Sequence, residues 1–163
     1  MDLKDIPLFK SLTEREFKIV TSRLKKVIYS AGDVIIKEGD IGNEMYIFES
    51  GKVKITRKLT LRVAGRWGEA EKAMDVLDSN QVSFFGEMSL VTGAPRSATI
   101  TAITDCVLYT LTKKDLEDIA KRYPEIGYKI MKEVATVLAK RVQKLNNTVL
   151  KLTTALSIVA SSK

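Results

Sequence analysis

The stretch FFGEMSLVTGAPRSATI (residues 84–100) contains the side chains with the clearest chemical potential in this sequence. It places one carboxylate, Glu87, and one guanidinium, Arg96, nine positions apart in an apolar run rich in small residues. A guanidinium can hold a phosphate through two parallel hydrogen bonds, and a carboxylate can accept a hydrogen bond from a sugar hydroxyl. The pair therefore fits a site for a ribose phosphate, although the same two residues could also form a surface salt bridge across a turn.

The neighbours of this pair add backbone and hydroxyl groups that a phosphate needs. Gly86 allows the backbone to approach a ligand closely and to adopt an unusual φ. If GEMSL forms one helical turn at the end of a strand, the backbone N–H groups of Met88 and Ser89 point toward an anion. Ser97 and Ala98 are small enough to leave room beside the guanidinium, and Ser97 offers a hydroxyl donor.

Composition excludes several classes of enzyme. The chain of 163 residues contains no histidine, which rules out histidine-based zinc and iron sites and the Ser-His and Cys-His nucleophile pairs. An enzyme on a cupin-like β roll would also need metal-binding histidines. We therefore expect a protein that is not an enzyme and that carries no metal or cofactor.

Charge and hydropathy limit the partners. The net charge is +7, but the basic residues are scattered and many fall on one face of a predicted C-terminal helix, so we expect no direct contact with nucleic acid. No apolar run approaches the roughly 20 residues of a membrane-spanning helix, and the first residues lack the layout of a signal peptide. Cys106 is the only cysteine, which favours a reducing, cytoplasmic location.

Most of the chain can be assigned to helices or strands from its pattern. Residues 1–30 are predicted to be helical, with a capping box formed by Thr13 and Glu16. Residues 32–57 and 98–111 are rich in β-branched and aromatic residues between glycines and aspartates, which predicts short antiparallel strands. A helix capped by Thr112 follows and is broken at Pro124.

Residues 58–81 are harder to assign. LTLRV and MDVL are typical of strands, whereas GRWGEAEKA between them suggests a loop or a short helical turn. Trp67 in this segment could pack within the loop or anchor a partner.

The order of elements predicts a mainly β protein with flanking helices. A short helix, many short strands and then helices do not fit alternating βαβ units. They fit a double-stranded β-helix (jelly-roll) barrel at about 25–112, with an N-terminal helix and a long C-terminal helix at about 126–160. We expect residues 1–163 to form one domain.

The long helix carries a heptad pattern. β-branched residues at a positions with leucine at d positions favour two parallel helices, and a homodimer is predicted through Leu138, Val142, Leu145, Val149, Leu152 and Leu156, with Val159 continuing the pattern. The alternative is a helix that lies on its own barrel, which needs only a 3.6-residue stripe. The preceding Ile126, Ile130 and Val134 are expected to pack on the barrel.

Two motifs together make this sequence similar to a known family. IIKEGDIGNEMYIFESG (residues 35–51), followed by FGEMSL and PRSATITA, resembles the cyclic nucleotide-binding domain of the catabolite activator protein, cAMP-dependent protein kinase regulatory subunits and cyclic-nucleotide-gated channels. DIPLFKSLTEREF resembles the usual opening of that domain. The resemblance covers roughly residues 3–145 and is weakest at residues 58–81.

The resemblance implies a role for each matching residue. Arg96 would pair with the exocyclic phosphate oxygens, Glu87 would accept the ribose 2′-hydroxyl, and Gly86 would allow the turn beside it. The remaining contacts would come from backbone amides or small side chains: Met88, Ser89, Ser97 and Ala98.

Recognition of the base is less defined. Members of the family commonly cap the base with the C-terminal helix, sometimes across a dimer, which points to Asn146, Asn147 and Thr148. The same three residues are also ordinary for a helix surface. We expect cAMP as the ligand in preference to cGMP, although Ser97 is also compatible with cGMP.

The predicted function is a non-catalytic sensor or regulatory module for signal transduction. Ligand would close the C-terminal helix over the site and alter the dimer seam. The chain ends soon after the last heptad, so no DNA-binding domain is expected. The alternative is a dimerisation or scaffold protein whose site is vestigial and binds no nucleotide.

Overall fold

The computed structural model describes residues 3–63 and 66–161, and for residues 60–63 and 66–71 it describes the backbone. The chain begins with two 3-10 turns, η1 (Leu3–Asp5) and η2 (Pro7–Phe9), and the helix α1 (Glu14–Thr21). The predicted capping box is confirmed, because the Thr13 hydroxyl accepts from the Glu16 N–H at 3.3 Å and the Glu16 carboxylate accepts from the Thr13 N–H at 2.7 Å. These bonds satisfy two N–H groups that the helix itself leaves unpaired.

The predicted helix to residue 30 is wrong at its C-terminal end. The segment Lys25–Tyr29 is strand β1, which pairs antiparallel with β8 (Cys106–Thr112) from Lys25↔Thr110 to Tyr29↔Cys106. Its sequence, KKVIY, has the β-branched and aromatic residues of a strand. A partner strand about 80 positions away decides the structure here.

Two antiparallel sheets of four strands form the barrel. One sheet has the order β1-β8-β3-β6 and the other β2-β7-β4-β5. The strands are β2 (Val34–Ile36), β3 (Glu44–Ser50), β4 (Lys52–Val63), β5 (Arg66–Asp78), β6 (Phe84–Phe85) and β7 (Thr99–Ala102). Flanked by helices, they make the jelly-roll architecture that the sequence predicts.

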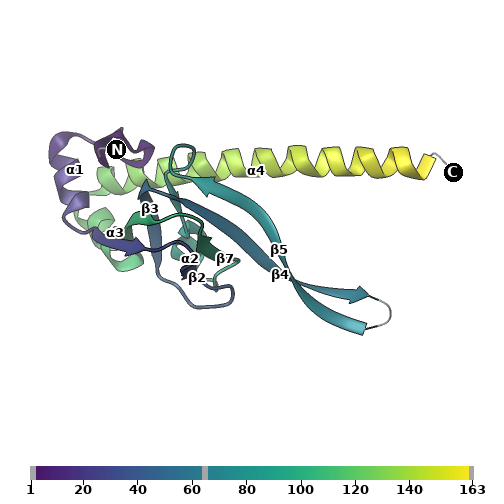
Figure 1. The fold of residues 1–163 in the computed structure, drawn as a ribbon. Coiled ribbons are helices and arrows are strands. Elements are labelled where there is room, and N and C mark those ends of the chain that lie inside the picture. The colour runs from purple at the N-terminus through teal and green to yellow at the C-terminus, as the bar shows by residue number, and fades with distance from the viewer. Residues whose placement is uncertain (1–2, 64–65, 162–163) are drawn as a thin grey trace.

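The segment that was hardest to assign forms a long hairpin. β4 and β5 pair from Lys52↔Asp78 to Val63↔Arg66, with one register shift between Ile55 and Thr56, so the expected loop or helical turn is wrong over residues 66–73. β7 pairs with β4 only from Val53 to Thr56, and the outer part of the hairpin extends away from the barrel as a two-stranded ribbon (Figure 1). The predicted packing of Trp67 concerns a side chain outside the described residues.

Strand β3 divides the interior into two apolar clusters. Successive side chains of a strand point to opposite faces. Met45 and Ile47 therefore pack into a cluster under the helices, whereas Tyr46 and Phe48 pack between the two sheets. All four residues are at most 6% exposed, which explains why this strand is a continuous apolar run rather than an alternating one.

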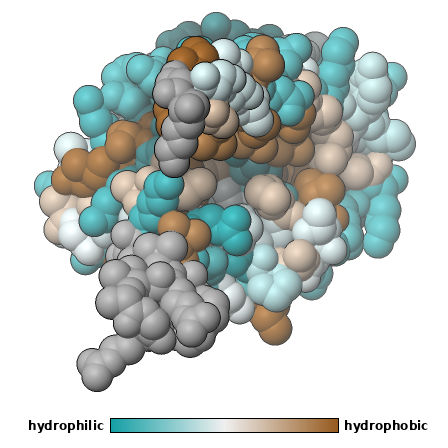
Figure 2. Space-filling view, turned by 90° about the vertical axis from the view of Figure 1, so that its right-hand side faces the viewer, coloured by the Kyte–Doolittle hydropathy of each residue, from teal (hydrophilic) through white to brown (hydrophobic). Residues whose placement is uncertain are grey.

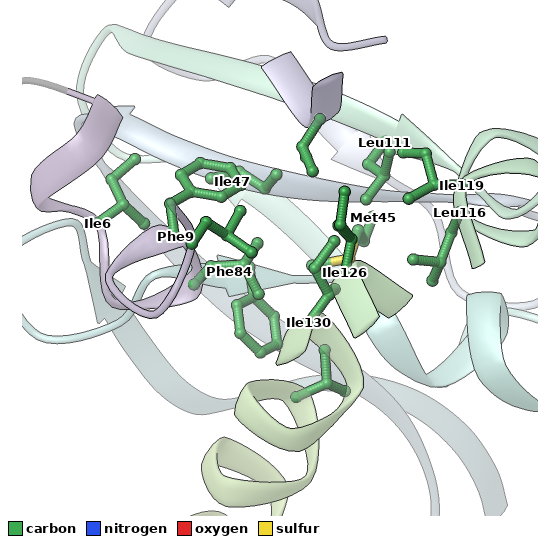
Figure 3. Close-up of a cluster of buried hydrophobic side chains, with 14 of the residues drawn as sticks. Ile6, Phe9, Met45, Ile47, Phe84, Leu111, Leu116, Ile119, Ile126 and Ile130 are labelled. Carbon is green, nitrogen blue, oxygen red and sulfur yellow. The ribbon is translucent and has the colours of Figure 1, made fainter. Parts of the chain in front are cut away.

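The cluster under the helices fixes the start of the last helix. Figure 3 shows side chains from η2, β3, β6, α3 and α4 converging there. The helix α3 (Lys113–Arg122) is capped by the Thr112 hydroxyl, as predicted, and α4 (Pro124–Ser161) begins at the proline. Ile126, Ile130 and Val134 are at most 2% exposed, so their predicted packing on the barrel is confirmed.

The remainder of α4 leaves the barrel. Figure 1 shows the helix crossing one side of the molecule and extending beyond the barrel as an isolated helix. Lys129 donates to Glu16 of α1 at 2.7 Å and ties its first turns to the N-terminal helix. Among the described residues, no helix is both long and apolar enough to cross a membrane.

Candidate functional site

A small cavity of about 100 Å³ lies between the two sheets, α2 (Glu87–Thr92) and α4. Its apolar wall comes from the barrel and includes Ile36, Phe85 and Ile100. All seven residues that the sequence predicts to bind ligand line this cavity: Gly86, Glu87, Met88, Ser89, Arg96, Ser97 and Ala98.

The backbone of GEMSL has the predicted form. Gly86 caps α2 with φ of 79°, a left-handed conformation that a residue with a Cβ adopts only with strain. α2 then begins at Glu87, so the N–H groups of its first turn have no partner within the helix. A Cβ at position 86 would also lie 3.0 Å from the Arg96 guanidinium, which explains the glycine beside the charged pair.

Arg96 is buried and held by neutral and charged acceptors. Its side chain is 5% exposed, and it donates to the Gly86 carbonyl at 3.0 Å and to the Glu44 carboxylate at 3.2 Å. Tyr46 donates to the same Glu44 oxygen at 3.1 Å, and burial is the main cause that raises the pKa of this phenol, which therefore stays protonated. The guanidinium is thus oriented toward the cavity before any ligand binds.

The glycine-rich loop between β2 and β3 holds the backbone of Arg96. The Arg96 N–H donates to the Asp40 carbonyl at 2.8 Å, and the Gly39 N–H donates to the Arg96 carbonyl at 2.9 Å. Gly42 lies against the side chain, since a Cβ built there would overlap the guanidinium. The two sequence motifs, residues 35–51 and 84–100, therefore meet at one arginine.

Substituting Gly42 with alanine is expected to weaken binding of an anionic ligand at least about tenfold, because the new methyl group must displace the Arg96 guanidinium. Gly42 has no left-handed φ, so alanine should fit its backbone without strain. Isothermal titration with cAMP measures the affinity, and Gly39→Ala, where a Cβ meets nothing within 4 Å, is the control for a glycine change in the same loop. Because Gly39 has φ of 88°, alanine there strains the backbone, so the thermal unfolding of the Gly39→Ala variant should be compared with that of the unmodified chain. Unchanged affinity in Gly42→Ala would contradict this account of the loop.

Glu87 and Arg96 are not partners, so the surface salt bridge considered for them does not form. Glu87 is 1% exposed and instead pairs with Arg141 of α4, whose guanidinium donates to Glu87 at 2.5 Å and to the Phe84 carbonyl at 2.8 Å. The guanidinium also lies over the Phe84 ring, 5.8 Å from its centre. The last helix is therefore bonded directly to the carboxylate of the site.

Sequence reasoning missed Arg141. It stands among several lysines on a helix, where a basic residue is usually solvated. The one available signal was the buried Glu87, because a buried carboxylate needs a cationic partner and α4 was the element expected to cover the site.

The three residues proposed for base recognition lie elsewhere in this conformation. Asn146, Asn147 and Thr148 are exposed on α4, more than one turn beyond Arg141, and do not line the cavity. The Thr148 hydroxyl donates to the Lys144 carbonyl of its own helix.

A second ion pair joins α4 to the barrel, because Lys144 pairs with Asp75 of β5 at 2.7 Å. Burial opposes ionisation of Asp75, but this ammonium and the Val76 N–H leave its pKa below the usual range.

Comparison with known proteins identifies relatives of this chain. Residues 26–123 match the family model described as cyclic nucleotide-binding domain. The "Cyclic AMP receptor protein" of Thermus thermophilus is 30% identical over 142 residues, covering 87% of this chain and 60% of the relative. The "cAMP-dependent protein kinase regulatory subunit" of Dictyostelium discoideum is 36% identical over 104 residues, covering 64% of this chain and 29% of the relative. The chain thus spans less than two thirds of the length of each of these two relatives.

A solved structure has the same fold. A cyclic nucleotide-binding domain from Methylobacillus flagellatus superposes with a TM-score of 0.75, covering 91% of this chain and 78% of that one. Its sequence identity is 20%, so this likeness supports the architecture of the two sheets and helices.

Proposed function

Because the chain belongs to the family of cyclic nucleotide-binding domains, we propose that it is a non-catalytic sensor module that binds cAMP in preference to cGMP. The preference for cAMP is supported by the two relatives described above, which are named for cAMP. The proposed module comprises residues 1–163, with the barrel at about 25–112 and the dimerisation helix at about 126–160. A cytoplasmic location, expected from the single cysteine, stays a prediction.

The observation that carries this proposal is a pair of buried residues of opposite charge type that do not bond to each other. Arg96 and Glu87 are 6% and 1% exposed and line one cavity, and they pair with Glu44 and Arg141 rather than with each other. A phosphate on Arg96 and a ribose hydroxyl on Glu87 would each add a hydrogen bond to a charged group, the stronger kind. N–H groups of Met88 and Ser89 and the Ser97 hydroxyl would complete the phosphate site.

The cavity also indicates how binding would reach α4. A volume of about 100 Å³ is below the roughly 300 Å³ at which ligand pockets usually begin, so a nucleotide must displace part of the lining. Arg141 is the lining residue from α4, and it bonds to the carboxylate that would receive the ribose. Ligand would therefore change the position of α4 through Glu87 and Arg141, and Asn146, Asn147 and Thr148 would meet the base after that movement.

Isothermal titration with cAMP, cGMP and linear 5′-AMP tests this function. We expect a dissociation constant in the micromolar range or below for cAMP, weaker binding of cGMP, and no saturation with 5′-AMP. If neither cyclic nucleotide binds below about 1 mM, the site is vestigial and the scaffold alternative is favoured. Heteronuclear spectra should show shifts in α4 with ligand, and unchanged resonances there would contradict the proposed coupling.

We also propose that the module dimerises through α4. Val142, Leu145, Val149, Leu152 and Leu156 are 50% to 68% exposed, so the heptad seam does not pack on the barrel of its own chain. Leu138 is partly buried against the barrel cluster and marks where the seam begins. A row of exposed a and d residues on a free helix is what a parallel partner would cover.

Placing a charge in the seam is expected to abolish assembly. Leu152→Lys, at a d position, should give a particle of the monomer mass of 18.2 kDa in light scattering after gel filtration, whereas the unmodified chain should contain at least two copies. Tyr128→Lys is the control, because Tyr128 is 67% exposed on the same helix but lies outside the seam. Equal masses for Leu152→Lys and the unmodified chain would show that the seam is not the interface.

A further inference from the structure

The carboxylate of Glu44 is bonded to the guanidinium that would hold the phosphate. Arg96 donates to Glu44 at 3.2 Å and to the Gly86 carbonyl at 3.0 Å, and the Glu44 side chain is 29% exposed. Glu44 is not among the described residues that line the cavity, so it would act on a ligand through Arg96 and through its own charge. A phosphate on Arg96 would therefore share its cation with a carboxylate of the protein.

The neighbours of Glu44 hold this carboxylate in place. Tyr46, two residues further along β3, donates to the same Glu44 oxygen at 3.1 Å. The Tyr46 side chain is buried, and its ring stacks on Phe85, with ring centres 5.3 Å apart and planes 11° apart. The backbone of Glu44 pairs with Thr112 of β8. We therefore expect the carboxylate to remain beside Arg96 when an anion arrives.

The two cations that line the cavity are each paired with a carboxylate. Among the described lining residues these cations are Arg96 and Arg141. Arg96 pairs with Glu44, and Arg141 pairs with Glu87. The two pairs sum to zero, so they hold no net positive charge to balance an incoming anion. A ligand with one negative charge leaves one charge unbalanced here, and a ligand with two leaves two.

Charges at this site are weakly screened because the surroundings are apolar. Ile36, Phe85 and Ile100 form a buried wall of the cavity. Figure 2, which looks along α4 from its C-terminal end, shows hydrophobic surface directly beneath the helix. The energy of a pair of charges rises as the effective dielectric constant of their surroundings falls. The charge of Glu44 should therefore act strongly on a phosphate bound to Arg96.

Cyclic and linear nucleotides differ in the charge of the phosphate. A cyclic phosphodiester carries one negative charge, whereas a phosphate monoester such as 5′-AMP loses its second proton near pH 6 and carries close to two charges at about pH 8. For a phosphate about 7 Å from the carboxylate, across the guanidinium, a dielectric constant of about 20 gives a repulsion of roughly 50-fold in affinity per ligand charge. Because Glu44 is partly exposed, we expect at least about tenfold.

We propose that Glu44 makes the site selective for phosphodiester monoanions, because its charge lets Arg96 accept one negative charge and repels the second charge of a phosphomonoester. This inference rests on the proposed function, in which Arg96 holds the phosphate. Glu44 positions Arg96 and at the same time sets the ligand charge that the site accepts. The module would thereby distinguish a cyclic nucleotide from the linear monophosphate that forms when its ring is hydrolysed.

Competition of linear nucleotides against cAMP, followed by isothermal titration at about pH 8, tests the proposal. The probes are 5′-AMP and its phosphate monomethyl ester, which is also linear but carries one negative charge. The unmodified chain should bind the methyl ester at least about tenfold more tightly than 5′-AMP. In Glu44→Gln the amide oxygen can still accept from Arg96 and Tyr46, and this ratio should fall to about threefold or less. The affinity for cAMP should be unchanged or higher.

Glu49→Gln is the matched control for a loss of charge from the same strand. The Glu49 side chain is 26% exposed and pairs with Lys26 of β1 at 2.9 Å, and Glu49 is not among the described residues that line the cavity. The ratio of the two linear nucleotides should therefore match that of the unmodified chain. Thermal unfolding of both variants would show that they are folded.

Three results would overturn the proposal. A ratio in Glu44→Gln within about twofold of the unmodified value, or no competition by either linear nucleotide in both proteins, would show that ring geometry and not charge excludes 5′-AMP. A loss of cAMP affinity above about tenfold in Glu44→Gln would show that Glu44 only holds Arg96 in place. If the unmodified chain binds no cyclic nucleotide, the proposed function fails and this inference fails with it, whereas cAMP binding with an unaltered ratio leaves the proposed function standing.

Discussion

Replacing Arg96 with alanine is expected to weaken cAMP binding by about 30-fold or more. The Arg96 side chain is 5% exposed, and its guanidinium donates to the Gly86 carbonyl and the Glu44 carboxylate. The backbone N–H of Arg96 donates to the Asp40 carbonyl in the glycine-rich loop between β2 and β3. Removing one partner of a buried charge-assisted contact typically costs about 2–5 kcal/mol, and each 1.4 kcal/mol is tenfold in affinity. Isothermal titration of the folded variant gives the number directly.

Two further variants test whether the loss of cAMP affinity comes from the phosphate contact of Arg96. Arg96→Lys keeps the charge but loses the planar fork, and should recover only part of the affinity. Arg57→Ala removes an arginine that is 54% exposed on β4 and paired with Glu38, and should bind cAMP normally. Binding by Arg96→Ala within threefold of the unmodified chain would remove the phosphate role from this residue.

The second large effect is expected on stability without ligand. Arg141→Ala leaves the Glu87 carboxylate, 2% exposed in its side chain, without its cationic partner. Breaking a buried ion pair from one side costs about 3–5 kcal/mol, and because Arg141 is one-third exposed we expect about 2 kcal/mol of unfolding free energy. Urea denaturation of the ligand-free protein measures this loss.

The neighbouring ion pair of the same helix provides the control. Lys144→Ala removes a pair with Asp75 whose partners are 71% and 43% exposed, and should cost less than about 1 kcal/mol. Adding Glu87→Gln to Arg141→Ala should recover part of the stability, because a neutral amide is cheaper to bury than an unpaired carboxylate. If Arg141→Ala and Lys144→Ala lose the same stability, the buried pair does not hold α4 on the site.

The site could be predicted from sequence to the extent that it is local. Gly86 to Ser89 and Arg96 to Ala98 are set by a left-handed glycine, one turn of helix and a short loop, all visible in the 13 residues 86–98. Arg141 could not be found in this way, because its partner lies 54 positions earlier and nothing in its own neighbourhood distinguishes it from a solvated arginine.

The same distinction applies to the fold. The capping box at Thr13 and the short strands between glycines follow from neighbouring residues, and both were predicted. Residues 25–29 continue a helical pattern, and their pairing with β8 overrides it. The hairpin of β4 and β5 escaped prediction because its middle segment, GRWGEAEKA, has a weak strand propensity and depends on the register of the strand beside it.

The position of β8 has a consequence for how the protein is synthesised. β8 lies between β1 and β3 in its sheet, yet it is the last strand in the chain. As the chain leaves the ribosome, β1 and β3 each present an unpaired edge until residues 106–112 have emerged. The nascent chain is therefore most prone to aggregate just before the barrel can close, and a translational pause ahead of residue 106 would lengthen that exposure.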